Sequence, residues 1–101
     1  MSDIEKLKAE FYAEMLDILE SEREVGFSSN YFRQMVNEFG GVEAAHRLLR
    51  PERQLPPIFA HLRSIGRIDL AMESRVLKER YRALFSEDER AVARFRLDHE
   101  L

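Results

Sequence analysis

The sequence contains no cysteine. This absence excludes a disulfide framework, a thiolate nucleophile and a zinc–thiolate site, so any metal site would need histidine and carboxylate ligands. It also fits a reducing compartment, and we expect a cytoplasmic protein. No apolar run approaches the roughly 18 residues that span a bilayer, and the first residues mix both charges, so we expect no membrane insertion.

Glycine and proline are scarce, with four and three copies among 101 residues. Together with 45% apolar and 35% charged residues, this composition favours a folded helical protein over a disordered one. The length suits one hydrophobic core, so we expect a single domain over residues 1–101. Apolar residues recur at helical spacing with almost no strand-like alternation, which predicts an all-α fold, a compact bundle of five to six helices.

The few helix breakers mark the expected boundaries in the first half of the chain. The capping-box sequence Ser2–Glu5 opens a first helix, and Gly26 ends it. A second helix begins after residues 28–29 and is closed by the glycine pair 40–41. A short third helix follows at once and cannot continue through Pro51.

The second half has similar signals. "LPPIFAHLRSIG" places proline at the start of a fourth helix and Gly66 at its end, with Ile58, Phe59, Leu62 and Ile65 on its inner side. A fifth helix follows Asp69, and we expect a bend in it near Lys78. The sequence Ser86–Glu89 forms a second capping box that opens the last helix.

Three charged residues, Arg67, Asp69 and Glu73, lie among apolar residues of the fourth-to-fifth helix junction. Asp69 occupies the expected N-cap position, and Arg67 is close enough in sequence to form a bidentate pair with Glu73. The two carboxylates are four residues apart and share a helix face, so they could also hold a divalent cation or share a proton. An arginine beside them would lower both carboxyl pKa values, which favours a structural ion cluster over catalysis.

The histidines lie on three different expected helices, at positions 46, 61 and 99. No two of them have the spacing of a metal-binding helix or of a zinc finger, so we expect no metal and no cofactor. The sequence also lacks a serine in a glycine-rich elbow and a phosphate-binding G-x-x-x-x-G-K loop. We therefore expect no enzymatic activity.

Three segments have a distinctive order, namely "FRQMVNEFGGVEAAHRLL", "FAHLRSIGRIDLAMESRVL" and "YRALFSEDERAVARFRL". This order resembles a group of short uncharacterised bacterial proteins with a GGVEAA segment, a GRLDLTVE-like segment and a closing helix opened by LF. The match extends over roughly residues 31–97, with Arg63 at an expected tryptophan position and Ala71 at an expected threonine position. The resemblance implies a one-domain helical architecture and no known activity.

Residues 31–65 also read like the opening of a helix-turn-helix, with a glycine-containing turn and an alanine-rich second helix. Nucleic-acid binding through this corner would rest on Arg47, Arg50, Arg53 and Arg63. The fourth helix would have to enter the groove, but it offers one permanent cation and neither asparagine nor glutamine on its outer side. The acidic first helix would oppose phosphate.

The first 27 residues carry eight acidic and three basic side chains. The expected first helix places a strip of acids away from its apolar side, formed by Glu10, Glu14, Asp17, Glu20 and Glu24. Such a strip is usually a solvated surface, but it could dock on a basic protein surface, including the cationic groove of a nucleic-acid-handling enzyme.

The second expected helix has an unusually apolar side, formed by Tyr31, Phe32, Met35, Val36 and Phe39. Core packing explains most such stripes, and self-association into a homodimer is the other interpretation. Taken together, the sequence favours a non-enzymatic accessory or regulatory protein that acts through contacts with a protein partner. The alternative is a nucleic-acid-binding protein of the helix-turn-helix type.

Overall fold

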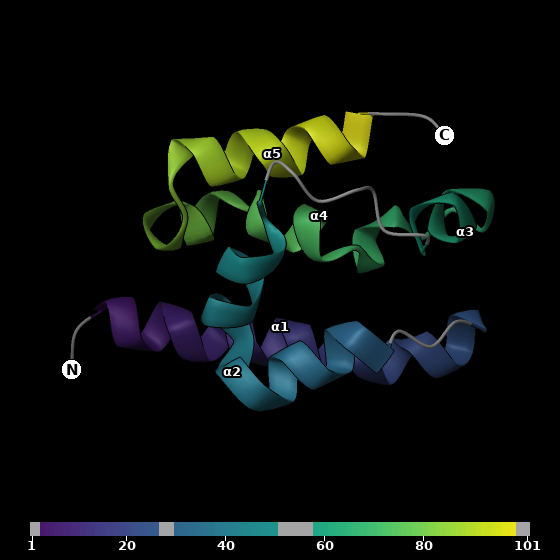
Figure 1. Ribbon diagram of the computed structural model, residues 1–101, viewed down its shortest axis with the longest axis horizontal. Coiled ribbons are helices and arrows are strands. Elements are labelled where there is room, and N and C mark those ends of the chain that lie inside the picture. The colour runs from purple at the N-terminus through teal and green to yellow at the C-terminus, as the bar shows by residue number, and fades with distance from the viewer. Residues whose placement is uncertain (1–2, 27–29, 51–57, 99–101) are drawn as a thin grey trace.

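The computed structural model describes residues 3–26, 30–50 and 58–98 (Figure 1). Every element of these ranges is helical, which confirms the all-α prediction. The elements are α1 (Asp3–Val25), α2 (Asn30–Leu48), α3 (Ile58–Ser64), the 3₁₀ helix η1 (Ile68–Leu70), α4 (Met72–Val76), the 3₁₀ helix η2 (Glu79–Leu84) and α5 (Glu87–Asp98). Within the described ranges, none of these helices combines the length and the apolar character needed to cross a membrane.

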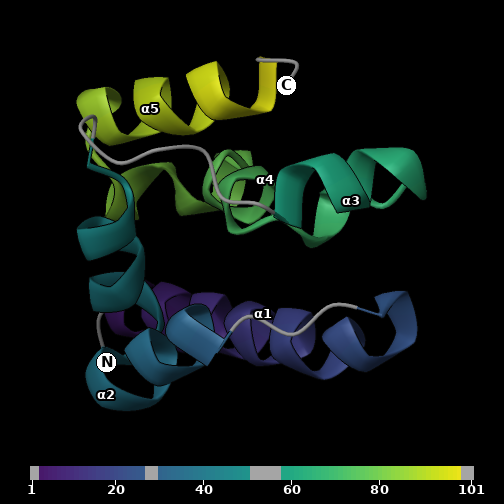
Figure 2. The ribbon, with the colours of Figure 1, turned by 45° about the vertical axis from the view of Figure 1, so that its right-hand side comes forward.

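The elements form three layers, which Figures 1 and 2 show from two directions. The first layer holds α1 and the first part of α2, and the last holds α5. The short elements α3, η1, α4 and η2 lie between them. The first two helices run antiparallel, since Arg33 reaches the backbone carbonyl of Leu19 while Gly41 lies against Tyr12.

A sharp kink at Gly40 divides α2 and sends its second part up through the layers toward α5 (Figure 2). Gly40 has φ 81° and ψ −174°, a backbone conformation that is essentially restricted to glycine. The predicted break between a second and a third helix is therefore confirmed. Gly26 has φ 74° just after the end of α1, so the predicted stop of the first helix is confirmed as well.

The main core lies between α1 and the helices that cover it. From α1 it takes Phe11, Met15, Ile18 and Leu19, which recur at spacings of three and four as expected for one side of a helix. The Phe11 ring meets the rings of Tyr81 and Phe85 edge-on, with ring centroids 5.2 and 5.1 Å apart. This contact joins the first helix to residues near the end of the chain.

The helix boundaries in the last part of the chain lie where the sequence predicts them. The bend near Lys78 is confirmed, because α4 ends at Val76 and η2 begins at Glu79. The capping box at α5 is also confirmed. The backbone N–H of Ser86 donates to the Glu89 carboxylate at 2.9 Å, and the backbone N–H of Glu89 donates to the Ser86 hydroxyl at 3.1 Å.

A smaller apolar cluster under α3 contains Leu62, Leu70 and Ala71. Leu62 is buried as predicted, but Ile65 is 42% exposed, so its predicted inner position is wrong. The reason is that α3 ends at Ser64 and the chain turns at Gly66. The side chains of Ile58 and Phe59, the cap at residues 28–29, the capping box at Ser2 and the proline pair lie outside what the structure describes.

Candidate functional site

The predicted ion cluster at the fourth-to-fifth helix junction is divided in the structure. Arg67 and Asp69 form an exposed pair, with Nε and Oδ1 3.2 Å apart. Hydrogen bonding to Arg67 lowers the pKa of Asp69. The N-cap prediction for Asp69 is wrong, because this residue lies inside η1 and the residue that precedes α4 is Ala71. The extra 3₁₀ turn delays the start of the helix by two residues.

The predicted Arg67–Glu73 pair is also wrong, because Glu73 pairs with Arg96 of α5 at 2.9 Å. The two side chains are only 3% and 5% exposed, and Arg96 also donates to the backbone carbonyl of Arg50 at 3.0 Å. Burial raises the pKa of Glu73, and the hydrogen bond from Arg96 opposes that rise. The pair therefore fastens α4 to α5 and the end of α2 inside the molecule.

The acidic strip of α1 lies in water only in part, because Asp17, Glu20 and Glu24 are exposed but the prediction fails for Glu14. Glu14 is 15% exposed, and its carboxylate accepts hydrogen bonds from Arg75 at 3.1 Å and Lys78 at 2.8 Å, and another from the Tyr81 hydroxyl. Burial would raise the pKa of Glu14, but these three donors together lower it. The prediction fails because α4 and η2 bring basic side chains against this side of α1.

Two other strip residues also have internal partners. Arg75 reaches Asp17 at 3.3 Å, and Arg80 pairs with Glu10. Glu20 and Glu24, near the end of α1, are exposed. Of the five candidate contact residues, Glu10, Glu14 and Asp17 thus contact Arg80, Arg75 or Lys78, and Asp17 is exposed together with Glu20 and Glu24.

Replacing Glu14 with Gln is expected to lower the free energy of unfolding by about 1–2 kcal/mol, because the amide cannot keep three charge-assisted or hydroxyl donors equally well bonded. The matched control, Glu20→Gln, lies on the same helix in water and should change stability by less than about 0.5 kcal/mol. Urea denaturation of both variants measures the difference. Equal stability of the two variants would contradict the role assigned to Glu14.

The stabilising contribution of Glu14 should depend on pH, and its direction follows from the pKa of this residue. The pKa of Glu14 is lowered from its ordinary value of 4.5, so its stabilising contribution is present above about pH 4.5 and is lost as the pH falls through the folded-state pKa. The difference in free energy of unfolding between wild type and Glu14→Gln should therefore be largest near neutral pH and should decrease in acid.

The arginines of the helix-turn-helix hypothesis have separate intramolecular contacts. Arg47 pairs with Glu43 at 3.2 Å and stacks over the Phe39 ring at 4.0 Å, and Arg63 donates to the backbone carbonyl of Leu97. Arg50 is exposed, and Arg53 lies outside the described residues. Of the three described arginines, Arg47 and Arg63 are thus engaged in contacts within the chain.

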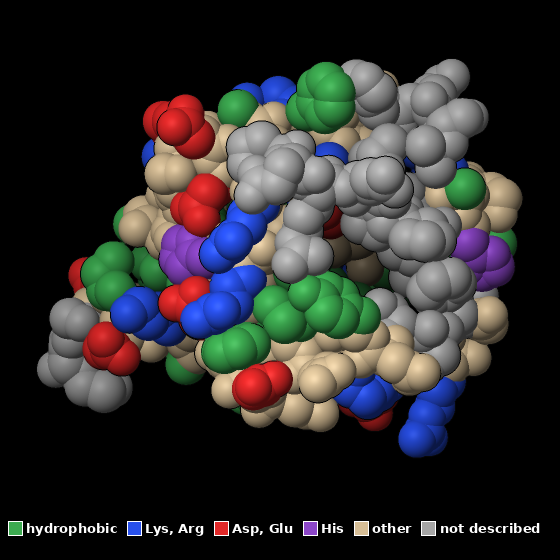
Figure 3. Space-filling model, viewed as in Figure 1, with side chains coloured by type: hydrophobic (Ala, Val, Ile, Leu, Met, Phe, Trp, Pro, Cys, Tyr) green, Lys and Arg blue, Asp and Glu red, His purple; other side chains and the backbone are tan. Residues whose placement is uncertain are grey.

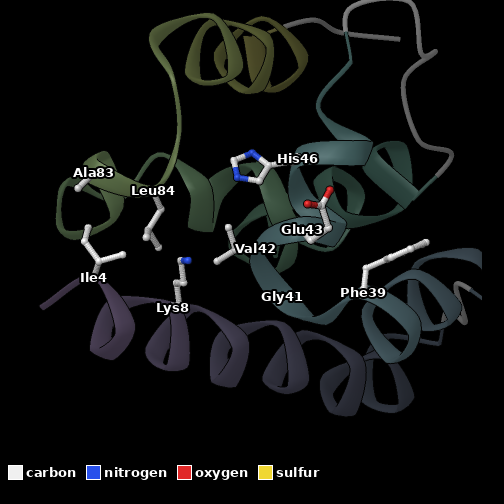
Figure 4. A pocket seen from close by; sticks show the side chains of 9 residues that line it. All are labelled: Ile4, Lys8, Phe39, Gly41, Val42, Glu43, His46, Ala83 and Leu84. Atoms are coloured by element: carbon white, nitrogen blue, oxygen red, sulfur yellow. The ribbon is translucent and has the colours of Figure 1, made fainter. Parts of the chain in front are cut away.

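A hollow of about 450 Å³ opens where α1, the second part of α2 and η2 meet. We call it the α1–α2–η2 groove, and its lining consists of Ile4, Lys8, Phe39, Gly41, Val42, Glu43, His46, Ala83 and Leu84. Figure 4 shows Ile4 and Lys8 rising from α1 toward Leu84, Val42 and His46. On the left of the face drawn in Figure 3, apolar and charged side chains alternate around a histidine.

The groove combines an apolar lining with three polar side chains. Glu43 is paired with Arg47, and His46 Nδ1 lies 2.5 Å from a Glu89 carboxylate oxygen. Lys8 has the longest ion pair of the three, 3.9 Å to Glu5, and its side chain is 49% exposed. The groove therefore offers apolar contact together with one ammonium group that can take a further anionic partner.

Sequence reasoning did not identify this groove. Phe39 and Val42 pack against the main core, and each is only partly buried, so one part of each side chain lines the groove. Ile4 and Lys8 are one helical turn apart, as are Val42 and His46. The sequence shows that each pair lies on one side of its helix. It does not show that the Ile4–Lys8 pair and the Val42–His46 pair face each other in the fold.

Among the residues that the structure describes, no three His, Asp or Glu side chains gather as a metal-binding group. Comparison of the chain with models of known protein families, with curated proteins and with solved structures finds no match.

Proposed function

We propose that this protein is a non-enzymatic accessory or regulatory domain that binds a protein partner in the α1–α2–η2 groove. The observation that carries the proposal is the groove itself, a hollow of about 450 Å³ lined by apolar side chains together with Lys8, Glu43 and His46. Its volume lies within the range of roughly 300–1,000 Å³ that is typical of binding pockets. Its walls are helices held together by the buried core.

The fitting occupant is an amphipathic helix of the partner. Such a helix places apolar side chains at i, i+3 and i+4 into a groove, where Ile4, Phe39 and Val42 would meet them. An acidic side chain on the same helix would pair with Lys8, whose own partner Glu5 is 3.9 Å away. The polar rim would then fix the orientation of the helix, and apolar contact would supply most of the affinity.

Nucleic-acid binding through the corner of Arg47, Arg50, Arg53 and Arg63 is supported less well. Arg47 is held by Glu43 and Phe39, and Arg63 is bound to a backbone carbonyl of α5. Each would have to give up an internal contact to reach a phosphate. No observation on the described residues favours this function over the protein-binding one.

The proposal is tested by photo-crosslinking in the cells that produce the protein. A benzophenone amino acid replaces Ile4, at the groove, or Phe95, which is 58% exposed on α5. We expect the variant with the crosslinker at position 4 to form one specific adduct with another protein. The variant with the crosslinker at position 95 should form no adduct of the same mass. Mass spectrometry identifies the partner, and a peptide of its crosslinked segment provides a binding assay.

Charge reversal then tests the role of Lys8. Lys8→Glu should weaken binding of that peptide about tenfold or more, because it replaces an attraction by a repulsion at the rim. Lys6→Glu is the matched control, since Lys6 is exposed on the same helix and does not line the groove. Equal binding of the two variants, or the same adduct from both crosslinking positions, would refute the proposed site.

A further inference from the structure

The side of α1 that faces away from the core has a regular pattern of its own. We call it the α1 outer seam, and it consists of Glu5, Ala9, Tyr12, Leu16, Glu20 and Arg23. All six residues are exposed, and they recur at spacings of three and four, which places them on one side of the helix. The buried residues Phe11, Met15 and Ile18 point the other way.

The middle of the seam is apolar, one end carries Glu5, and the other end carries Glu20 followed by Arg23. Tyr12 is 39% exposed and Leu16 is 41% exposed, and the small residue Ala9 adjoins them. Glu5 and Arg23 are 18 residues apart, which is five turns of an α-helix, so they lie on the same line along α1. The seam thus has Glu5 at its first extremity, Arg23 at its last, Glu20 one turn before Arg23, and the apolar pair Tyr12 and Leu16 between them.

We propose that the α1 outer seam pairs antiparallel with the same seam of a second copy of this chain. A two-fold axis beside residue 14 brings together residues whose numbers add to 28. Tyr12 of each copy then packs on Leu16 of the other, and Glu5 of each copy meets Arg23 of the other. Alternating spacings of three and four are those at which paired helices interlock their side chains.

The charge pattern identifies the occupant as a second copy. In a two-fold interface residue i meets residue j while j meets i, so one surface must be complementary to itself. The seam fulfils this condition in the antiparallel direction, because reversing it places Glu5 of each copy on Arg23 of the other, while Glu20 comes level with Lys8 of the other copy. In the parallel direction Glu5 would meet Glu5 and Arg23 would meet Arg23, which is repulsive at both ends.

The contact is a single helix pair, which is small for a protein interface. Interfaces below roughly 1,200 Å² belong to weak and transient complexes. We therefore expect a dimer whose population depends on concentration in the micromolar range or above. The core and the ion pairs that join α1, α4, η2 and α5 do not depend on it, and the internal pair that it would compete with, Glu5 with Lys8 at 3.9 Å, is exposed, so dissociation leaves folded monomers.

Sedimentation equilibrium over a concentration series tests the proposal through a charge swap. Glu5→Arg and Arg23→Glu should each raise the dimer Kd about tenfold, because each removes two attractions and creates two repulsions. The double variant should return the Kd to near the wild-type value. Both single changes oppose the dipole of α1, and the double variant combines them, so restored association cannot come from a more stable helix.

Three results would overturn the proposal. These are a wild-type chain that stays monomeric up to about 1 mM, single variants with an unchanged Kd, and a double variant as weak as the singles. Circular dichroism at each step confirms that the variants are helical. A single variant that fails to fold is replaced by Leu16→Glu, which should abolish the dimer by putting a charge against Tyr12 of the other copy.

Cysteine crosslinking tests the direction and register of the pair, since the chain has no cysteine of its own. Ala13 and Ala9 are both exposed on α1. In the proposed register Ala13→Cys lies beside its own copy, whereas Ala9→Cys is displaced from its copy by about 15 Å along the helix. A short bis-maleimide should crosslink the first variant and not the second, and the opposite result would exclude this register.

Discussion

Replacing Arg96 with Met should lower the free energy of unfolding by about 3–5 kcal/mol at pH 7. The substitution leaves the Glu73 carboxylate, which is 3% exposed, without the guanidinium that lies 2.9 Å from it. It also removes the donor to the backbone carbonyl of Arg50. An uncompensated buried charge is among the most destabilising single changes, and this pair is the most deeply buried ion pair in the described part of the chain.

The double variant Glu73→Leu with Arg96→Met is the control that separates charge from packing. It removes both charges and fills the site with apolar atoms of similar size, so most of the lost stability should return. Urea denaturation of the wild type, the single variant and the double variant measures the coupling between the two side chains. If the double variant is as unstable as Arg96→Met, the loss comes from packing of Arg96 and not from the unpaired carboxylate.

The pH dependence of Arg96→Met follows from burial of Glu73. Burial raises the pKa of Glu73, and losing Arg96 removes the hydrogen bond that opposes this rise. A carboxyl group whose folded pKa is above its unfolded value binds its proton more readily in the folded state, so folding is favoured at low pH and this advantage is lost as the pH rises. The loss in free energy of unfolding caused by Arg96→Met should therefore be largest near neutral pH and should decrease as the pH falls.

Gly41→Ala should lower the free energy of unfolding by about 1–3 kcal/mol, as expected for an overpacked contact. A Cβ atom at this position would lie 2.8 Å from the Tyr12 Cα, a backbone atom that no rotamer change can move. The two helices would have to separate by several tenths of an ångström. Their shared core, which includes Phe11 and Val36, would loosen as a result.

Whether Gly41→Ala raises or lowers the free energy of unfolding shows which of two contributions is larger, the helix propensity of alanine or its steric overlap with α1. Alanine is favoured over glycine inside a helix by about 0.8–1 kcal/mol, so a site with free space would gain stability from the change. Close approach of α1 and α2 predicts a loss instead. Thermal and urea denaturation measure the sign directly, and a stabilised variant would show that the helices do not approach this closely.

The elements of the fold were largely predictable because their ends depend on local chemistry. Gly26 and Gly40 adopt positive φ angles that other residues rarely adopt, and Ser86 and Glu89 complete a capping box within four residues. Asp69 shows the limit of such signals. An acid before an apolar run is equally compatible with a helix cap and with a place inside a 3₁₀ turn, and the structure has the second.

The ion pairs and the groove could not be predicted because they join distant parts of the chain. Glu73 and Arg96 are 23 residues apart, and Glu14 and Arg75 are 61 residues apart. Helical periodicity says which side of a helix is apolar, but it does not say which element covers which side. The acidic side of α1 therefore looked free for an external partner, although α4 and η2 supply its basic partners.

The contacts of Glu14 with Arg75, Lys78 and Tyr81 have a consequence for biosynthesis. The ribosome makes α1 first, but the residues that hold its acidic side and cover Phe11 are made only after about three quarters of the chain. In the nascent chain α2 can cover part of the apolar side of α1, but the part of Phe11 that contacts Tyr81 and Phe85 stays uncovered until those residues are made, and contacts between residues so far apart form late. A nascent chain that stalls before residue 81 therefore lacks these contacts and is open to capture by chaperones.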